Sequence, residues 1–580
     1  MQIIDHQESH EILANDETVK EHSINCNNSQ TRSLSRKSSL NVSRNSSKEN
    51  VVQKQHLVAT VFELTGIQEK EGSKEFGTLI LLGVMLLLFI ISITGFFIMW
   101  FTEYYNDTML SQIILKNDSE STRNWMNPNP KYDTLLKVHI FNYTNIDKYF
   151  AGVDDKIKVE DIGPLTYKEH TTKVNVSFNK NYTVTFRDHR TYQFLPEKSN
   201  CEERDIFVLP NVPLISASTK IEKINIFKKI MAINLINAYD EGAFKTLTAH
   251  EFLWGYRDRI VSLDIGTGST HFGLLMNRNG TSVDSLQINT GEDDIRKFSI
   301  ITQFNGQPLL DFWSDQKCNR VDGSDASMFP PHILNTREDL QVFLQVLCRK
   351  IPLSFEKEVT ILNNIDAFRY RTPLNVFSSP ENNPENECYC HNTQVCLPSG
   401  VINATKCYNG APIFPSFPHF FSGDPKIYKD FDGIKPSREL HQTYADIHPR
   451  FAFPISGASR IQINIAVHKG SILKNKLDRI KEGTILPLIW IEITSGDFTD
   501  EIIDNLYIST FGLNAIQYAL KYGTLFACII SFALIVGGFY NLTQKRRQHA
   551  NLALSKTECE SFTRLTTSNN VTFRRNTRPK

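Results

Sequence analysis

Two uncharged apolar runs, one near each end of the chain, constrain the fold more than any other feature. The first covers 76–101 (FGTLILLGVMLLLFIISITGFFIMWF) and the second 522–540 (YGTLFACIISFALIVGGFY). At about 1.5 Å per residue, either run forms a helix long enough to cross a hydrocarbon core about 30 Å thick. A soluble core rarely surrounds a helix that is apolar on every side over such a length. We therefore predict two transmembrane helices.

The residues beside these runs indicate the orientation. The segment 1–75 lacks the basic start, short apolar core and cleavage site of a secretory signal, so the first run is expected to be an uncleaved signal anchor. Lys545, Arg546 and Arg547 follow the second run, and basic residues beside a span are typical of the cytoplasmic side. We expect both tails to be cytoplasmic and 102–521 to form an extracellular or lumenal domain.

Both tails have unusual compositions. The N-terminal tail, 1–75, contains RSLSRKSSLNVSRNSS and is expected to be disordered, whether as a kinase substrate or as an unmodified spacer. The C-terminal tail, 541–580, carries nine basic and two acidic residues, which leaves +7 and favours contact with the anionic inner leaflet.

The overall composition excludes other classes of protein. The 580 residues include 63 basic and 63 acidic side chains, so no net charge attracts the chain to nucleic acid. A mean hydropathy of -0.28 excludes a transporter with many spans.

Sequons and cysteines support a domain in the secretory pathway. Seven Asn-x-Ser/Thr sequons between the spans are candidate glycosylation sites: Asn106, Asn117, Asn142, Asn175, Asn181, Asn279 and Asn403. Six of the ten cysteines fall within one ninety-residue stretch: Cys318, Cys348, Cys388, Cys390, Cys396 and Cys407. An even cluster outside the cytoplasm indicates three disulfides. Zinc at CYCHNTQVC is the competing interpretation, disfavoured because no second ligand pair follows at zinc-finger spacing.

The domain between the spans shows alternating apolar residues typical of antiparallel strands. Alternation over 172–194, with Asn179-Lys180 between two runs, predicts a hairpin, and similar patterns recur from Ile461 and from Leu486. The segment 221–239 (IEKINIFKKIMAINLINAY) has helical length and is apolar on more than one side. It is either a helix buried between neighbours or one whose surplus apolar face contacts a lipid or a protein.

Motifs for catalysis are incomplete. Gly266-Thr267-Gly268 lacks the Lys-Ser/Thr of a phosphate-binding loop, and His250-Glu251 lacks the second histidine of a metalloprotease. His419 is interpreted as a packed histidine and not as a general base. We expect a non-enzyme with no cofactor, no metal and no catalytic residue.

Several motifs follow one another in the order found in a known family. They are IGPLTYKEH at 162–170, LWGYRD at 253–258, CNRVDGSDASMFPP at 318–331 and SFPHFFSGDP at 416–425, followed by Thr443-Tyr444 and Asp446-Ile447. In these motifs the chain resembles the class B scavenger receptors, which include fatty-acid translocase, the high-density-lipoprotein receptor and lysosomal integral membrane protein type 2.

The resemblance implies a fold and a function. The implied fold is α+β, a large antiparallel β-barrel-like domain with a hydrophobic tunnel and an apical helical bundle. The family pattern pairs Cys318 with Cys388, Cys348 with Cys407 and Cys390 with Cys396, and leaves Cys201 as a free thiol. It places a ligand-binding apex at Ile224, Phe227, Lys228, Lys229 and Met231.

The expected partners are lipids, fatty acids, cholesterol or lipoprotein particles at the plasma membrane. The alternative is a sorting or adhesion receptor for a protein ligand in lysosomal or endosomal membranes. Homo-oligomerisation stays open.

Overall fold

The computed structural model describes residues 71–128, 134–263, 269–362, 364–390, 396–473 and 476–569. The predicted disorder of the N-terminal tail therefore concerns residues that lie almost entirely outside the described ranges. The described chain divides into two compact units: the outer parts of the terminal helices, and a large domain that covers 95–523.

Among the described residues, two helices are long and apolar enough to cross a membrane, as the sequence predicts. Helix α2 covers Glu71–Phe101, and its apolar part is Phe76–Phe101. The second apolar stretch lies within a longer helical region. In this region α13 (Asp500–Tyr507), a π-helical turn (η9, Ile508–Gly512) and α14 (Leu513–Asn569) follow one another. The second helix thus extends well beyond the predicted run 522–540 in both directions.

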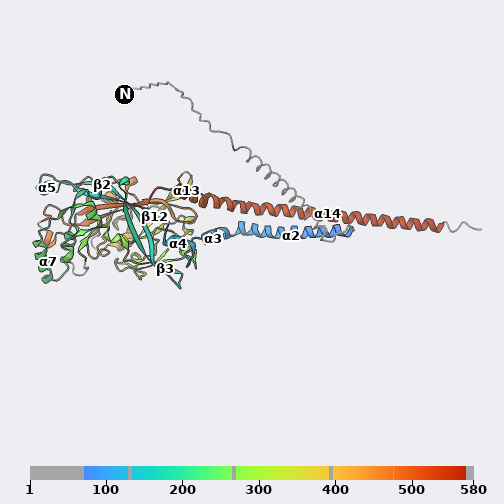
Figure 1. Ribbon diagram of the computed structural model, residues 1–580, viewed down its shortest axis with the longest axis horizontal. Helices are drawn as coiled ribbons and strands as arrows, with labels where there is room; N and C mark the ends of the chain where they lie inside the picture. Colours follow the sequence, from blue (N-terminus) through green and yellow to red (C-terminus); the bar gives the residue numbers. More distant parts are fainter. Residues whose placement is uncertain are drawn as a thin grey trace, which may run out of the picture. The chain divides into compact units, whose positions relative to one another are not determined.

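The helices between α2 and α14 are short and lie within or beside the large domain (Figure 1). In chain order the helices after α2 are α3 Tyr104–Leu110, α4 Glu120–Met126, α5 Ile146–Phe150, α6 Val212–Ile221, α7 Ile226–Ala238, α8 Ala249–Trp254, α9 Gln316–Asn319, α10 His332–Thr336, α11 Arg438–His441, α12 Gly470–Leu473, α13 Asp500–Tyr507 and α14 Leu513–Asn569.

One antiparallel sheet dominates the large domain. Within the described residues it has thirteen strands in the order β10-β9-β3-β2-β1-β17-β16-β15-β13-β12-β11, with β8 and β14 at its side. Its strands are β1 Thr134–Tyr143, β2 Ile157–Asn179, β3 Thr183–Phe194, β8 Gly280–Thr281, β9 Leu286–Asn289, β10 Ile301–Phe304, β11 Leu340–Leu344, β12 Arg349–Ile361, β13 Ile365–Arg371, β14 Phe431–Asp432, β15 Tyr444–Ile447, β16 Pro454–Ala466 and β17 Ile485–Ser495. Two small pairs add β4 Ile206–Pro210 with β5 Phe244–Thr248 and β6 Tyr256–Arg257 with β7 His271–Phe272.

The two edges of this sheet are joined by the segment around Gly323. Ile301 on β10 donates its N–H to Gly323 O, and Phe343 on β11 donates its N–H to Ser324 O, both over 2.8 Å. A Cβ on Gly323 would lie 3.0 Å from the backbone of Gln341 and of Phe343, so glycine lets the edges approach. The nearly closed antiparallel sheet agrees with the predicted fold class.

Of two local predictions, one is confirmed and one is only partly right. The hairpin forms, with β2 and β3 flanking its turn, but the predicted helix over 221–239 is interrupted. Asn225 caps a new helix by accepting from the N–H of Lys228, so α7 begins at Ile226 and Ile224 lies in the connection from α6.

Candidate ligand-binding surface

Helix α7 presents an apolar face to solvent. Its exposed apolar side chains are Ile226, Phe227, Ile230, Met231 and Leu235. Side chains four residues apart lie above one another on a helix, so these five form two adjacent rows. Phe227 is 77% exposed and Met231 66%, whereas Ile236 is the one residue of this helix that is fully buried. A contiguous exposed apolar surface of this kind is typical of an interaction site.

The two predicted cations of this helix have different surroundings. Lys228 is exposed and forms no ion pair within the described residues. Lys229 pairs with Glu222, which also accepts from the N–H and Oγ of Ser471 over 2.9 Å. These hydrogen bonds, with that from Lys229 the strongest, lower the pKa of Glu222 to about 2. Lys229 therefore links α7 to α12 through Glu222, whereas Lys228 is exposed to solvent.

The position of α7 suits docking. In the large domain α7 lies at the end away from α3 and α13, the elements that continue into the two membrane-spanning candidates (Figure 1). Of the predicted apex residues, the structure brings Phe227, Lys228 and Met231 onto exposed positions of α7, and Ile224 is exposed just before it.

The two faces of the large sheet differ in chemistry. Lys137 and Arg460 lie opposite Glu492 in the strand registers, and both pair with its carboxylate, over 3.0 and 2.7 Å. The next register row points to the opposite face and is apolar: Val138 on β1, Ile491 on β17 and Ile461 on β16. Because a nearly closed sheet buries its inner face, we assign the apolar row to the interior. The charged row lies on the other face, where Lys137 is a third exposed and Arg460 and Glu492 are largely buried.

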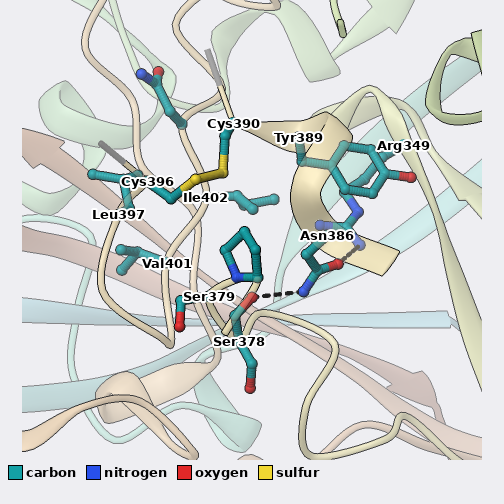
Figure 2. A pocket seen from close by; sticks show the side chains of 12 residues that line it. Arg349, Ser378, Ser379, Asn386, Tyr389, Cys390, Cys396, Leu397, Val401 and Ile402 are labelled. Carbon is teal, nitrogen blue, oxygen red and sulfur yellow. Dashed lines mark hydrogen bonds between the residues drawn. A yellow bond between two sulfur atoms is a disulfide. The ribbon is translucent and has the colours of Figure 1, made fainter. Parts of the chain in front are cut away.

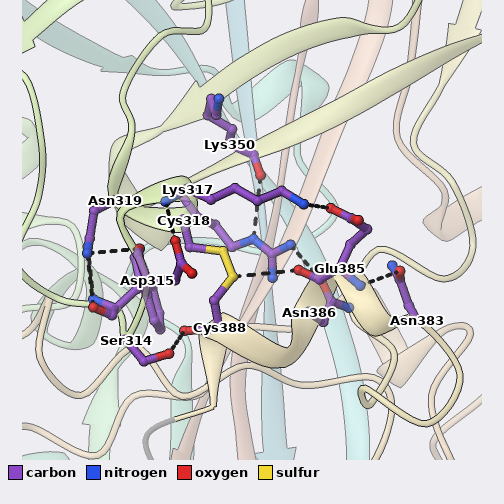
Figure 3. The surroundings of a disulfide bond; sticks show 12 residues. Ser314, Asp315, Lys317, Cys318, Asn319, Lys350, Asn383, Glu385, Asn386 and Cys388 are labelled. Atoms are coloured by element: carbon purple, nitrogen blue, oxygen red, sulfur yellow. Dashed lines mark hydrogen bonds and ion pairs between the residues drawn. A yellow bond between two sulfur atoms is a disulfide. The ribbon is translucent and has the colours of Figure 1, made fainter.

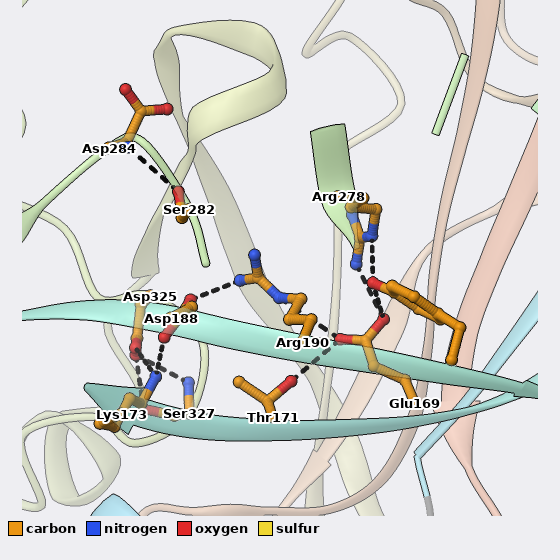
Figure 4. Close-up of polar contacts among 11 residues, drawn as sticks. Glu169, Thr171, Lys173, Asp188, Arg190, Arg278, Ser282, Asp284, Asp325 and Ser327 are labelled. Atoms are coloured by element: carbon orange, nitrogen blue, oxygen red, sulfur yellow. Dashed lines mark hydrogen bonds and ion pairs between the residues drawn. The ribbon is translucent and has the colours of Figure 1, made fainter. Parts of the chain in front are cut away.

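A second polar network connects the β2–β3 hairpin to neighbouring segments of the large domain (Figure 4). Lys173 lies 2.7 Å from Asp188 and 3.8 Å from Asp325, which belongs to the segment that joins the sheet edges. Further along, Glu169 accepts from Arg278 over 3.1 Å. Burial raises the pKa of Glu169, but Arg278 and Arg190 outweigh it and hold the pKa below its usual value. The network is structural, since every charge in it is paired.

The six clustered cysteines form three disulfides: Cys318–Cys388, Cys348–Cys407 and Cys390–Cys396. Figure 3 shows the first of them, beside which Ser314 donates its Oγ to Cys388 O over 3.0 Å and Lys317 pairs with Glu385. Cys201 is half-buried and forms no disulfide, and burial, with Asp205 nearby, raises the pKa of its thiol to about 11.

The sequons differ in accessibility. The side chains of Asn117, Asn175, Asn181 and Asn279 are exposed, and those of Asn106, Asn142 and Asn403 are half-buried. Asn142 in addition accepts the N–H of Val208 over 2.9 Å, so its amide already joins β1 to β4. The first four are better placed to carry glycans.

His419 lies in a buried polar cluster on the outer face of the sheet. Its Nε2 is 2.9 Å from Asp161, which also accepts from Trp490 and lies 3.0 Å from His139 Nδ1. Its Nδ1 accepts the N–H of Lys435, so the ring is used on both sides. Within the described residues no group of three His, Cys, Asp or Glu side chains is arranged to hold a metal ion.

Comparisons with known proteins identify the family of the chain. The sequence model of the CD36 family matches residues 81–539, which includes most of both apolar runs. Human lysosome membrane protein 2 is 33% identical over 392 residues, which is 66% of this chain and 79% of the relative. Scavenger receptor class B member 1 of the pig is 29% identical over 444 residues, 74% of this chain and 84% of the relative. The mouse protein of the same name is 29% identical over 399 residues, 66% of this chain and 75% of the relative. The chain therefore belongs to the CD36 family.

Proposed function

We propose that this protein is a class B scavenger receptor of the plasma membrane. It binds lipoprotein particles, fatty acids or cholesterol at α7 and passes lipid through the interior of the sheet to the membrane, with both tails in the cytoplasm and without a catalytic step. The observation that carries the proposal is the exposed apolar face of α7, with Phe227 at 77% exposure beside unpaired Lys228. An apolar face with a cation at its edge suits an amphipathic surface with acidic headgroups or acids.

The inner face of the sheet supports the second half of this proposal. Ile461, Ile463 and Ile493 point inward by strand register and are only half-buried. Val138 on the same face is fully buried. The contrast with the half-buried isoleucines indicates that packing is not complete along this face. Each acyl methylene that leaves water for such a surface gains about 0.8 kcal/mol, which favours movement of lipid along it.

The test uses the full-length chain at the cell surface and compares particle binding with transfer of labelled lipid. Ile463→Trp fills the inner face, so we expect lipid transfer to fall several-fold while particle binding persists. Ile463→Val is the matched control and should leave both unchanged. Equal transfer by the Trp variant and the natural chain would rule out this route.

The similarity to human lysosome membrane protein 2 favours a second candidate, a receptor for a protein ligand in endolysosomal membranes. It predicts lysosomal location at steady state, capture of a soluble protein by α7, and no response of lipid transfer to either Ile463 variant. The localisation of the tagged full-length chain, together with the transfer assay, distinguishes the two candidates.

A further inference from the structure

Arg349, the first residue of β12, is a buried cation with an incomplete set of partners. Its side chain is 3% exposed. Nη2 donates to Asn386 Oδ1 over 3.1 Å and to Val376 O over 3.4 Å, and Nε lies 3.5 Å from Lys350 O. Nη1 is buried and has no acceptor among the described residues. Since a guanidinium stays protonated at any physiological pH, the described residues leave two N–H groups and a full positive charge unsatisfied.

No carboxylate of the described residues compensates this charge. The ring of Tyr389 lies 3.7 Å from the guanidinium and supplies a cation–π contact, but a ring carries no net charge. The residues 391–395, which are not described, read HNTQV and contain no acid. A buried charge without a counter-ion is strongly unfavourable, which indicates that an anion completes the site.

A cavity of about 200 Å³ adjoins Arg349 (Figure 2). Its polar lining consists of donors and amides and contains no acid: Arg349, Ser378, Ser379, Asn386 and Asn403. Ser378 Oγ forms no hydrogen bond to another described residue, and Asn403 uses its Oδ1 on the N–H of Thr405. The volume suits a small ion better than a complete acyl chain.

The site is held in place by covalent bonds. Arg349 follows Cys348, which is bonded to Cys407, and Tyr389 lies between two bonded cysteines, Cys388 and Cys390. Trp313 packs edge-on against Tyr389, with 5.0 Å between ring centroids. A rigid cation beside a preformed cavity loses little entropy when it binds a ligand.

We propose that the cavity beside Arg349 binds a small oxyanion, with the chemistry shared by carboxylates and by inorganic sulfate or phosphate. Arg349, which lines the cavity, supplies the charge, and Ser378 and Asn403 supply donors. This site lies on a different part of the chain from α7, so it stands independently of the proposed receptor function.

The experiment is equilibrium dialysis of the full-length chain in nanodiscs against radiolabelled sulfate and, separately, radiolabelled acetate at constant ionic strength. We expect saturable binding of one anion per chain. Tighter binding of sulfate identifies an inorganic ion as the source, and tighter binding of acetate identifies a carboxylate. Absence of saturable binding of either anion overturns the proposal.

Two variants locate the bound anion. Arg349→Gln should weaken binding at least about tenfold, because a charge-assisted hydrogen bond is lost. Arg337→Gln is the matched control, since Arg337 also lies over a ring, that of Phe355, but has a carboxylate partner in Glu358. Equal binding by the natural chain and Arg349→Gln contradicts the proposal.

If Arg349→Gln does not fold, Ser378→Trp replaces it, because this change fills the cavity and keeps the guanidinium. We expect it to abolish binding without a change in the unfolding temperature. Undiminished binding by a folded Ser378→Trp chain overturns the proposal as well.

Discussion

The disulfide-bonded segment 318–407 and helix α7 both combine cations with aromatic or apolar side chains, but they are held in opposite ways. Around Arg349 the charge is buried, the ring of Tyr389 is half-buried, and three disulfides hold the segment. On α7 the apolar side chains are exposed, and the described ion pair that holds this helix joins Lys229 to Glu222. The difference indicates that the first region supplies rigidity and that the second is kept accessible for a partner.

The largest expected effect on stability comes from removing a disulfide of the segment 318–407. Replacing Cys318 and Cys388 by serine opens a loop of 70 residues, and chain entropy then lowers the free energy of unfolding by about 4 kcal/mol. Opening Cys390–Cys396, with a separation of 6, should cost about 2 kcal/mol. Chemical unfolding of the ectodomain in the full chain measures both. Equal losses for the two pairs would contradict a loop-length effect.

The next effect concerns acid. Burial lowers the pKa of His441 to about 3 and, together with Arg450, that of His448 to about 4, against an ordinary value of 6.5. Below pH 6.5 the unfolded chain therefore binds protons that the folded chain does not, and stability is lost as the pH falls toward 4. For His448 the loss between pH 6.5 and pH 5 amounts to about 2 kcal/mol.

His448→Gln tests this acid effect, because glutamine does not titrate. His448 lies within 3.3 Å of Ser509 and Thr510 through Nε2, and an amide donor serves the same hydroxyls. We expect the variant to be less stable at pH 7 but to lose about 2 kcal/mol less than the natural chain on going to pH 5. Unfolding at the two pH values measures the slope, and an unchanged slope refutes the assignment.

The smallest effect concerns the tether of α7. Glu222→Gln removes the pair with Lys229, and such partly exposed pairs contribute about 0.5 kcal/mol. The pKa of Glu222 is lowered to about 2, so its contribution is complete above about pH 4.5 and is lost only as the pH falls toward 2. Hydrogen exchange of the α7 amides should therefore rise in the variant, by the same factor at pH 7 and at pH 5 after correction for intrinsic rates. A factor that disappears at pH 5 would show that the tether is already broken there.

Local patterns in the sequence predicted the elements that depend on neighbouring residues. The apolar runs predict both long helices, and alternation over 172–194 predicts the hairpin, since periodicity and a polar turn suffice for each. The break before α7 was missed because one capping side chain, Asn225, outweighs a helical apolar pattern.

Contacts between residues that lie far apart in the chain could not be predicted from local sequence patterns. Gln462 and Asn464 alternate with isoleucines on β16 and read as a solvated face, yet both are fully buried. They bond to Ser416 and Phe414, which lie nearly fifty residues away in the chain. The burial of Arg349 could not be predicted either, because its partner Asn386 lies 37 residues away in the chain and Tyr389 lies close to Asn386. The one sequence feature that pointed to Arg349 was its position directly after Cys348.

The measurement that tests the account most directly is binding of labelled lipoprotein to the full-length chain with Phe227→Glu and Met231→Glu combined. Both side chains are exposed, so the unfolding temperature should stay the same, while binding should fall at least about tenfold. Val283→Glu is the control, since Val283 is 81% exposed outside α7 and should bind as the natural chain does. Lipoprotein binding that is unchanged in the double variant would contradict the claim that α7 is the ligand-binding surface.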